Sequence, residues 1–523
     1  GSLYNNPYAL LVQGYRQQNK SNLQPQVELH QDLEGVIQGL KLRFMGYVQR
    51  NSSFAISRSY NPFFYSAGSL DGSDITLTPI NPGGPGSFGT TGSEYLSYGE
   101  GEKELKSSLY TETALNYNRI FKENHSVGAM VVTTMRNSLT GNAGTLERSL
   151  PKRNMGVSGR VTYGYKETYL TEFNFGYNGT ERFAANHRYG FFPAIGFGYN
   201  ISNEPFFKPL TSVISRFKLR GTYGLNGNDA IGRDEDRFFY LSNVDLTGGP
   251  GASFGEDPSN LYTRPGVTVL RYANDRITWE TSRQLNLGAD ISLFNDINLT
   301  IDAYRKTTSN ILQPRSAVPT TMGLLADAVA NVGKSQSQGI DFQADYNKSL
   351  GTKTWMQLRG TMTYATNKIL FYDEPTYPAS TSYLTKVGRS FDQQLGFVAE
   401  RLFTDDIEVS NSPSQSAIAG GVAVRGGDIK YRDMNNDGLI NNDDRVFMGL
   451  PTTPEMVYGF GFSLTHGSFD LNAQVQGSAR SSLFINAGGF NFNNLNQSGI
   501  SPFVQAGGYQ SGLLKAIADD HWS

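Results

Sequence analysis

The sequence predicts an all-β protein, and more specifically an antiparallel transmembrane β-barrel. Three observations lead to this fold class: apolar and polar residues alternate over long stretches, the stretches are long enough to cross a bilayer, and the connections between them differ in length. About 14 such stretches occur in the 523 residues, without an amphipathic helix of useful length. Alternation with a period of two indicates extended chain, because successive Cβ atoms point to opposite faces of a strand.

The clearest alternation runs from residue 153 to residue 182 and predicts a long hairpin. Each arm has about 12 residues, against the usual 5–6, and a tight turn at 166–168 separates the arms. One face is apolar and aromatic, and the other is polar. The residues expected to face lipid are Val157, Val161, Phe173 and Phe175, and those expected to face the lumen are Arg160, Glu172 and Asn174.

The same pattern predicts further strands before and after this hairpin. In chain order they are 22–33, 37–50, 104–120, 125–137, 189–201, 213–227, 276–293, 297–303, 338–347, 354–366, 455–465 and 468–485. A tilted strand needs roughly 9–11 residues to cross a bilayer, and most of these stretches are that long.

The connections separate this chain from a soluble β protein. Short turns flanked by aromatic residues such as Tyr163 and Tyr169 alternate with long loops, predicted at 228–275, 307–334 and 368–453. Outer-membrane barrels have this asymmetry, with short periplasmic turns, long extracellular loops and aromatic girdles. A soluble propeller or multi-sandwich protein would have shorter strands and turns every 8–12 residues. We therefore predict one domain over 1–523, a barrel portion with long extracellular loops.

Composition excludes several other classes. The net charge of −2 argues against a nucleic-acid partner, which selects for a basic surface. With no cysteine, the chain has neither a disulfide framework nor thiolate chemistry. No apolar run reaches the length of a transmembrane helix. We find no G-x-S-x-G or H-E-x-x-H motif and no metal-type spacing among the five histidines, so we expect no enzyme activity.

One loop has the spacing of a calcium site. Residues 433–444 read DMNNDGLINNDD, with side-chain oxygens at positions 1, 3, 5 and 12 and a glycine, Gly438, at the bend. The predicted ligands are Asp433, Asn435, Asp437, the carbonyl of Leu439, and Asp444. No helices flank the loop, so the expected role is a structural Ca²⁺ that holds an extracellular loop. The alternative is an Asn/Asp-rich turn without metal, since these residues favour turns by themselves.

Several segments resemble one family, the SusC/RagA-like TonB-dependent transporters of Bacteroidetes-type bacteria. They are GFFPAIGFGYNISNEPFFKP (190–209), LRGTYGLNGND (219–229), the segment 274–312, NVGKSQSQGIDF (331–342) and the segment 427–477. The matches keep their order along the chain and cover most of 100–480, which makes the resemblance specific.

The resemblance implies an outer-membrane barrel of about 22 strands that is filled by an N-terminal plug. Such proteins work with a SusD-like surface lipoprotein, import oligosaccharides or peptides, and take energy from the TonB complex. With about 14 strands, the chain is expected to be a portion of that barrel. We expect the plug to be absent from it, because nothing before residue 7 could form one. The TonB complex would then act through the missing N-terminal region.

Two other functions stay open beside active import. One is a passive porin or a structural outer-membrane barrel, and the other is a soluble carbohydrate-binding β protein. The sequence does not identify a ligand. Aromatic side chains in the loops could stack on sugars, or could pack the loops and contact a lid protein: Phe238, Phe239, Tyr240, Tyr372, Tyr377, Tyr383 and Phe397.

Overall fold

A single antiparallel sheet dominates the computed structural model, which describes residues 7–68, 76–233, 236–256 and 261–483. The sheet has 15 strands. Two of them, β1 (Gly14–Leu23) and β2 (Gln26–Asp32), pair with successive halves of β3 (Leu40–Ser59) and share one position. Pro25 lies between them and has no N–H to donate to the ladder. Fifteen strands less one shared position give 14 places across the sheet, which confirms the predicted number.

The strands follow chain order, each pairing with its neighbours along the path. After β3 come β6 (Ser97–Phe121), β7 (His125–Thr140), β8 (Lys152–Tyr165), β9 (Tyr169–Thr180), β10 (Tyr189–Asn200) and β11 (Ile214–Asn228). The path continues with β14 (Glu280–Leu293), β15 (Ile297–Pro314), β16 (Val329–Ser349), β17 (Thr354–Phe371), β22 (Met456–His466) and β23 (Phe469–Ala479). Such an up-and-down order is that of an outer-membrane barrel.

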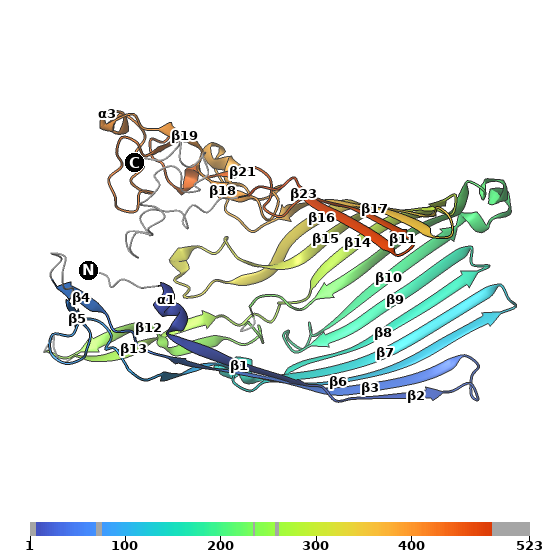
Figure 1. Cartoon of the computed structure of the whole chain (residues 1–523), viewed down its shortest axis with the longest axis horizontal. Helices are drawn as coiled ribbons and strands as arrows, with labels where there is room; N and C mark the ends of the chain where they lie inside the picture. Colours follow the sequence, from blue (N-terminus) through green and yellow to red (C-terminus); the bar gives the residue numbers. More distant parts are fainter. Residues whose placement is uncertain (1–6, 69–75, 234–235, 257–260, 484–523) are drawn as a thin grey trace.

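The two ends of the sheet differ, as the sequence predicted. Figure 1 shows tight turns at one end and the long loops at the other. The turn between β8 and β9 places Lys166 and Glu167 at φ 51° and 56°, the left-handed pair of a type I′ turn. One connection departs from the pattern. Residues 201–213 lie at the short-turn end but contain two 3₁₀ helices, η1 (Ile201–Asn203) and η2 (Pro205–Leu210).

Strand register keeps apolar and polar residues on separate faces. Val161 lies opposite Phe173, and Phe173 lies opposite Ile195, so one face is apolar across β8, β9 and β10. On the other face Arg160 lies opposite Asn174. Val161 is 49% exposed and Phe173 is 43% exposed, so neither is packed in a closed, dry core. An apolar face that the protein itself leaves uncovered has hydrocarbon as its natural solvent, and we assign it to lipid.

The loop predicted at 307–334 is shorter in the structure. Strands β15 and β16 stay paired as far as Pro314 and Val329, so only 315–328 connects them. The sequence pattern ended too early because Thr307-Thr308-Ser309-Asn310 shows no alternation. A strand that rises above the bilayer meets water on both faces and needs no apolar side.

The other two predicted loops contain strands of their own. Within 228–275 a hairpin forms from β12 (Asn243–Phe254) and β13 (Tyr262–Arg271). Within 368–453 two small sheets form, and their strands are β18 (Gln394–Gly396), β19 (Ala399–Leu402), β20 (Ile429–Tyr431) and β21 (Val446–Met448). The smaller elements of the loops are β4 (Tyr65–Gly68), β5 (Thr76–Pro79), α2 (Leu146–Ser149), η3 (Thr320–Met322), η4 (Ala379–Leu384), α3 (Asp406–Ser410) and η5 (Asn442–Asp444). A short helix, α1 (Pro7–Val12), precedes β1.

In the part of the chain that the structure describes, no helix is long and apolar enough to span a bilayer.

Candidate functional site: the polar face and the loops above it

The polar face of the sheet carries ion pairs that link neighbouring strands. Arg160 of β8 donates to Glu172 of β9 at 2.6 Å, and Arg359 of β17 donates to Asp345 of β16 at 2.6 Å. Arg43 of β3 pairs with Glu112 of β6. Ion pairs of this kind therefore recur from one side of the sheet to the other, on the face opposite the apolar one. This face resembles the wall of a water-filled channel rather than a packed core.

Arg220 forms the densest of these clusters. Its guanidinium lies 2.5 Å from Asp302 of β15 and 3.5 Å from Asp290 of β14. Glycine at position 288 makes room for it, because a Cβ there would lie 2.8 Å from the Arg220 Cζ atom. The Asp302 Oδ1 atom is buried without a hydrogen-bond partner. Two carboxylates against one guanidinium leave a net negative charge at this point of the wall.

At the loop end, Arg237 ties three loops together. The side chain is 2% exposed and donates to the carbonyl oxygens of Leu150 and Pro151, each at 2.7 Å, and to Glu181 Oε1 at 2.7 Å. A third carbonyl, that of Glu147, accepts at 3.0 Å. Four acceptors satisfy most of the five donors of a guanidinium, which is what a buried arginine requires.

An apolar cluster fills the space beside this ion pair, on the polar side of the sheet. Its buried members are Phe183, Ile231, Phe239, Ile277 and Trp279. Phe192 of β10 packs against Trp279 with ring centroids 5.3 Å apart. Phe192 alternates with Phe191 and so extends from the polar face of β10, which means that the loops fold over that face. Gly227 is needed beneath it, because a Cβ there would lie 1.9 Å from the Phe192 ring.

The loop aromatics that the sequence suggested as ligand contacts are used for packing at several positions. Phe239 is 2% exposed within the apolar cluster and is closed to a ligand. Tyr383 donates its hydroxyl to the carbonyl of Asp443 at 2.6 Å, and burial together with nearby carboxylates raises its pKa. Phe397 packs on Tyr431 at 5.4 Å. These contacts favour the packing interpretation for Phe239, Tyr383 and Phe397.

The predicted calcium loop folds as a series of Asx turns. Asp433 accepts the N–H groups of Asn436 and Gly438 at 2.6 and 2.8 Å, and Gly438 has a φ of 84°. Asp437 accepts the N–H of Leu439 at 2.8 Å. The sequence was therefore right about the sharp bend at the glycine.

Asp444 does not take part in these turns and forms other hydrogen bonds. It is fully buried, and its two oxygens accept the N–H groups of Met434 and Asn441 at 2.8 and 2.9 Å. Among the described residues, no group of three or more His, Cys, Asp or Glu side chains is arranged to hold a metal ion. Calcium at this loop stays a prediction.

Comparison with known proteins identifies the family. The family model described as "TonB dependent receptor-like, beta-barrel" matches residues 2–512, nearly the whole chain. The chain belongs to this family. The predicted resemblance, the barrel fold and the place in the outer membrane are thereby confirmed.

Individual relatives agree with the family match. "TonB-dependent receptor P3" of Formosa agariphila is 26% identical over 91% of this chain and 46% of its own length. "TonB-dependent receptor SusC" of Bacteroides thetaiotaomicron is 25% identical over 61% of this chain and 30% of its own length. The chain thus spans less than half of the length of these curated relatives.

A solved structure shows the same fold. The RagAB peptide importer in its open-open state superposes with a TM-score of 0.60, at 16% identity, over 91% of this chain and 48% of that chain. At this identity the likeness concerns the fold alone.

Within this TonB-dependent receptor barrel, sequence reasoning missed Arg237. The residue ends the segment GRDEDR (232–237), which looks like a solvated, charged loop. Nothing in the local pattern separates Arg237 from Arg233, because its partners lie 56 and more residues away in the chain. An aromatic run directly after it, Phe238-Phe239-Tyr240, was the one available signal that this loop has a core.

Proposed function

We propose that this chain is the barrel portion of an outer-membrane importer that takes up a glycan or a peptide with energy from the TonB complex. The observation that supports the proposal is the polar face, where Arg43, Arg160, Arg220 and Arg359 are each paired with a carboxylate on a neighbouring strand. A wall of paired charges and amides offers both donors and acceptors to a hydrated solute.

Sugars and peptides both suit such a wall. Each presents hydroxyl or amide groups along its length, and each can exchange hydrogen bonds with side chains that are already half hydrated. Arg160 is half exposed on this face, and Glu172 is a third exposed, so both can reach a passing solute. One solved neighbour is a peptide importer, which supports a peptide as one of the two candidate solutes.

We also propose a SusD-like lipoprotein as the partner at the loop end. Five large apolar residues from four loops are each at least 70% exposed: Tyr95, Leu146, Leu246, Ile407 and Val422. Exposed apolar side chains on these loops offer the kind of surface that a protein partner buries, since the buried centre of a protein–protein interface is apolar.

A transport assay tests the proposal most directly. The full-length protein is purified from native membranes, and the accompanying lipoprotein and bound ligand are identified by mass spectrometry. Uptake of that ligand is then measured in cells with and without functional TonB. We expect uptake to need both TonB and the lipoprotein. Uptake that continues unchanged without TonB would mean a passive pore instead.

The calcium site is proposed at the loop 433–444 on the chemistry of its donors. Side-chain oxygens of Asp433, Asn435 and Asp437 and the Leu439 carbonyl are the hard ligands that Ca²⁺ prefers. Asp444 would be the fifth ligand, because each carboxylate oxygen keeps a second lone pair after accepting one N–H. The ion would hold together the turns that the Asx hydrogen bonds already form.

A further inference from the structure

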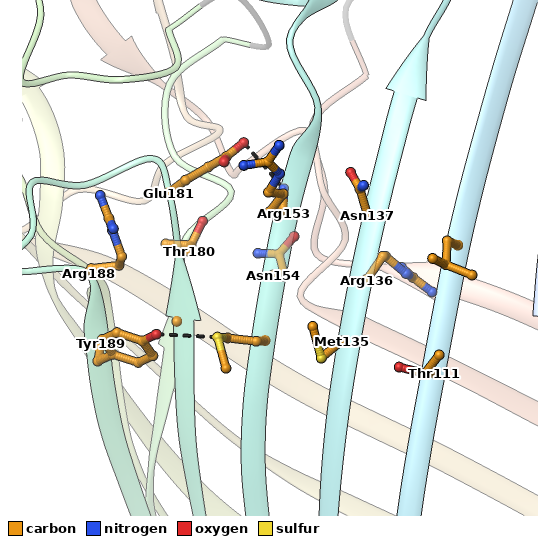
Figure 2. Close-up of a pocket in the computed structure, with 13 residues that line it drawn as sticks. Thr111, Met135, Arg136, Asn137, Arg153, Asn154, Thr180, Glu181, Arg188 and Tyr189 are labelled. Carbon is orange, nitrogen blue, oxygen red and sulfur yellow. Dashed lines mark hydrogen bonds between the residues drawn. The ribbon is translucent and has the colours of Figure 1, made fainter. Parts of the chain in front are cut away.

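The lipid-facing side of the sheet contains a groove near its loop end. The groove has a volume of about 630 Å³ and crosses β6 to β10. Its apolar part is formed by Leu109, Thr111, Met135, Met155, Gly179 and Tyr189. Figure 2 shows Thr111, Met135 and Tyr189 on separate strands of the sheet, and the Tyr189 hydroxyl donates to the Met155 sulfur at 3.3 Å.

Strand register explains why the groove is apolar. Met135 lies opposite Met155, Met155 lies opposite Gly179, and Gly179 lies opposite Tyr189. The four therefore form one row across the sheet on the lipid side. Gly179 is the low point of the row, because a Cβ there would lie 2.3 Å from the Tyr189 ring. The volume lies within the roughly 300–1,000 Å³ of ligand pockets, which accommodates a hydrocarbon chain.

The next row toward the loops begins with Leu109 and becomes polar at its following positions. Leu109 lies opposite Asn137, and Asn137 lies opposite Arg153. Because residues rise about 3.3 Å each along a strand, Arg153 stands only about 7 Å from the level of Met155. This change from apolar to polar within one step marks the level where acyl chains meet headgroups.

The edge of the groove nearest the loops is called the rim. Two arginines at this rim have no anionic partner in the described part of the chain. Arg153 and Arg188 line the groove, and neither forms an ion pair there; the Arg188 Nε atom is buried without a hydrogen bond. Glu181 also lines the rim, but its Oε1 atom forms an ion pair with Arg237 at 2.7 Å and accepts the backbone N–H of Arg153 at 3.3 Å, so its charge is already paired with Arg237. Arg136 turns to the polar face, where it donates to Tyr47 at 3.2 Å. The rim therefore carries an uncompensated positive charge.

We propose that this groove binds an anionic membrane lipid, whose headgroup phosphate is not neutralised by a cation of its own. One acyl chain lies across the row of Met135, Met155 and Tyr189, and the phosphate is held between Arg153 and Arg188. Arginine suits this role because its planar guanidinium can bind a phosphate through two hydrogen bonds. The proposal does not depend on which solute the barrel imports.

The test uses the full-length protein in nanodiscs of phosphatidylcholine that contain a minor fraction of phosphatidic acid. Native mass spectrometry measures which lipids stay bound after the disc is removed. We expect phosphatidic acid to be retained by the wild type. Arg153→Gln with Arg188→Gln should reduce that retention by about tenfold or more, because two charge-assisted hydrogen-bond groups are lost.

Two further variants make the result decisive. Arg119→Gln removes an arginine from the same face at the opposite, short-turn end, and should retain phosphatidic acid as the wild type does. Met155→Trp fills the groove and keeps both arginines, and should also lose the lipid. Equal retention of phosphatidylcholine and phosphatidic acid by the wild type would overturn the proposal, as would an equal loss in Arg119→Gln.

Discussion

Arg237 and Glu181 form an ion pair of 2.7 Å between loops that are 56 residues apart in the chain. The arginine side chain is 2% exposed and the glutamate side chain is 21% exposed. The pair lies beside the apolar cluster that packs on Phe192. It therefore joins the loops above the lumen into one body, and any movement of a loop that admits a solute has to move this body or break the pair.

Replacing Arg237 by alanine is expected to release these loops while the barrel stays folded. Breaking a buried pair leaves an uncompensated charge and costs about 3–5 kcal/mol. Amide hydrogen exchange in 141–151 and 228–242 should accelerate by roughly two orders of magnitude or more. Arg233→Ala, an exposed arginine in the same segment, is the matched control and should leave exchange unchanged. Equal protection in both variants would show that the pair does not hold the loops.

An arginine introduced on the lipid face should lower the stability of the barrel far more than one introduced on the polar face. Val131 of β7 is 45% exposed on the apolar side, and Thr134 of the same strand lies opposite Glu112 on the polar side. Val131→Arg is expected to cost about 2–4 kcal/mol in the unfolding free energy, the range for a cation near the bilayer midplane. In Thr134→Arg the new guanidinium lies near the Glu112 carboxylate, so the unfolding free energy should fall far less. Urea titration in lipid vesicles measures both, and equal costs would refute the assignment of the faces.

The sequence predicted the barrel well because the bilayer acts on every strand in the same way. Lipid on one side and water on the other impose alternation, so Val161, Phe173 and Arg160 could be assigned to faces before their register was known. The type I′ turn at Lys166-Glu167 closes the hairpin where the alternation stops. The number of strand positions followed from counting such stretches.

Acid should loosen the loop that contains α3. Glu408 accepts hydrogen bonds from Arg401, Thr404 and Lys430, and these, led by Arg401, lower its pKa from the ordinary value of 4.5. A lowered pKa in the folded state means that the carboxylate stabilises the loop above pH 4.5 and that this stability is lost as the pH falls further. Hydrogen exchange of 399–431 should therefore rise below that pH. Glu408→Gln should exchange faster at neutral pH and respond less to acid; an unchanged acid response would contradict this role.

Calcium should bind the loop 433–444 and protect it. Isothermal titration of the full-length protein with CaCl₂ is expected to show one site, and Asp437→Asn should weaken it because one anionic ligand is removed. Asp245→Asn, in another loop with an Asx turn, is the control and should bind as the wild type does. If the titration shows no heat of binding, the loop is an Asn/Asp-rich turn that its own hydrogen bonds hold without a metal ion.

What the sequence could not predict lies in the loops, where water surrounds every face. Thr307 to Asn310 gave no alternation although they belong to β15, because a strand above the bilayer has no apolar side. Arg237 resembled a solvated charge, since its acceptors belong to other loops. The place of Arg153 beside the groove depends on which strands become neighbours, and only the register reveals it.

The position of the two faces is tested most directly with single thiols at adjacent residues. The 523 residues contain no cysteine, so Phe173→Cys and Asn174→Cys each report one position. A fluorophore on each thiol is quenched in vesicles either by nitroxide-labelled lipid or by aqueous iodide. We expect lipid quenching at Phe173→Cys and iodide quenching at Asn174→Cys. Iodide quenching at Phe173→Cys together with lipid quenching at Asn174→Cys would contradict the account.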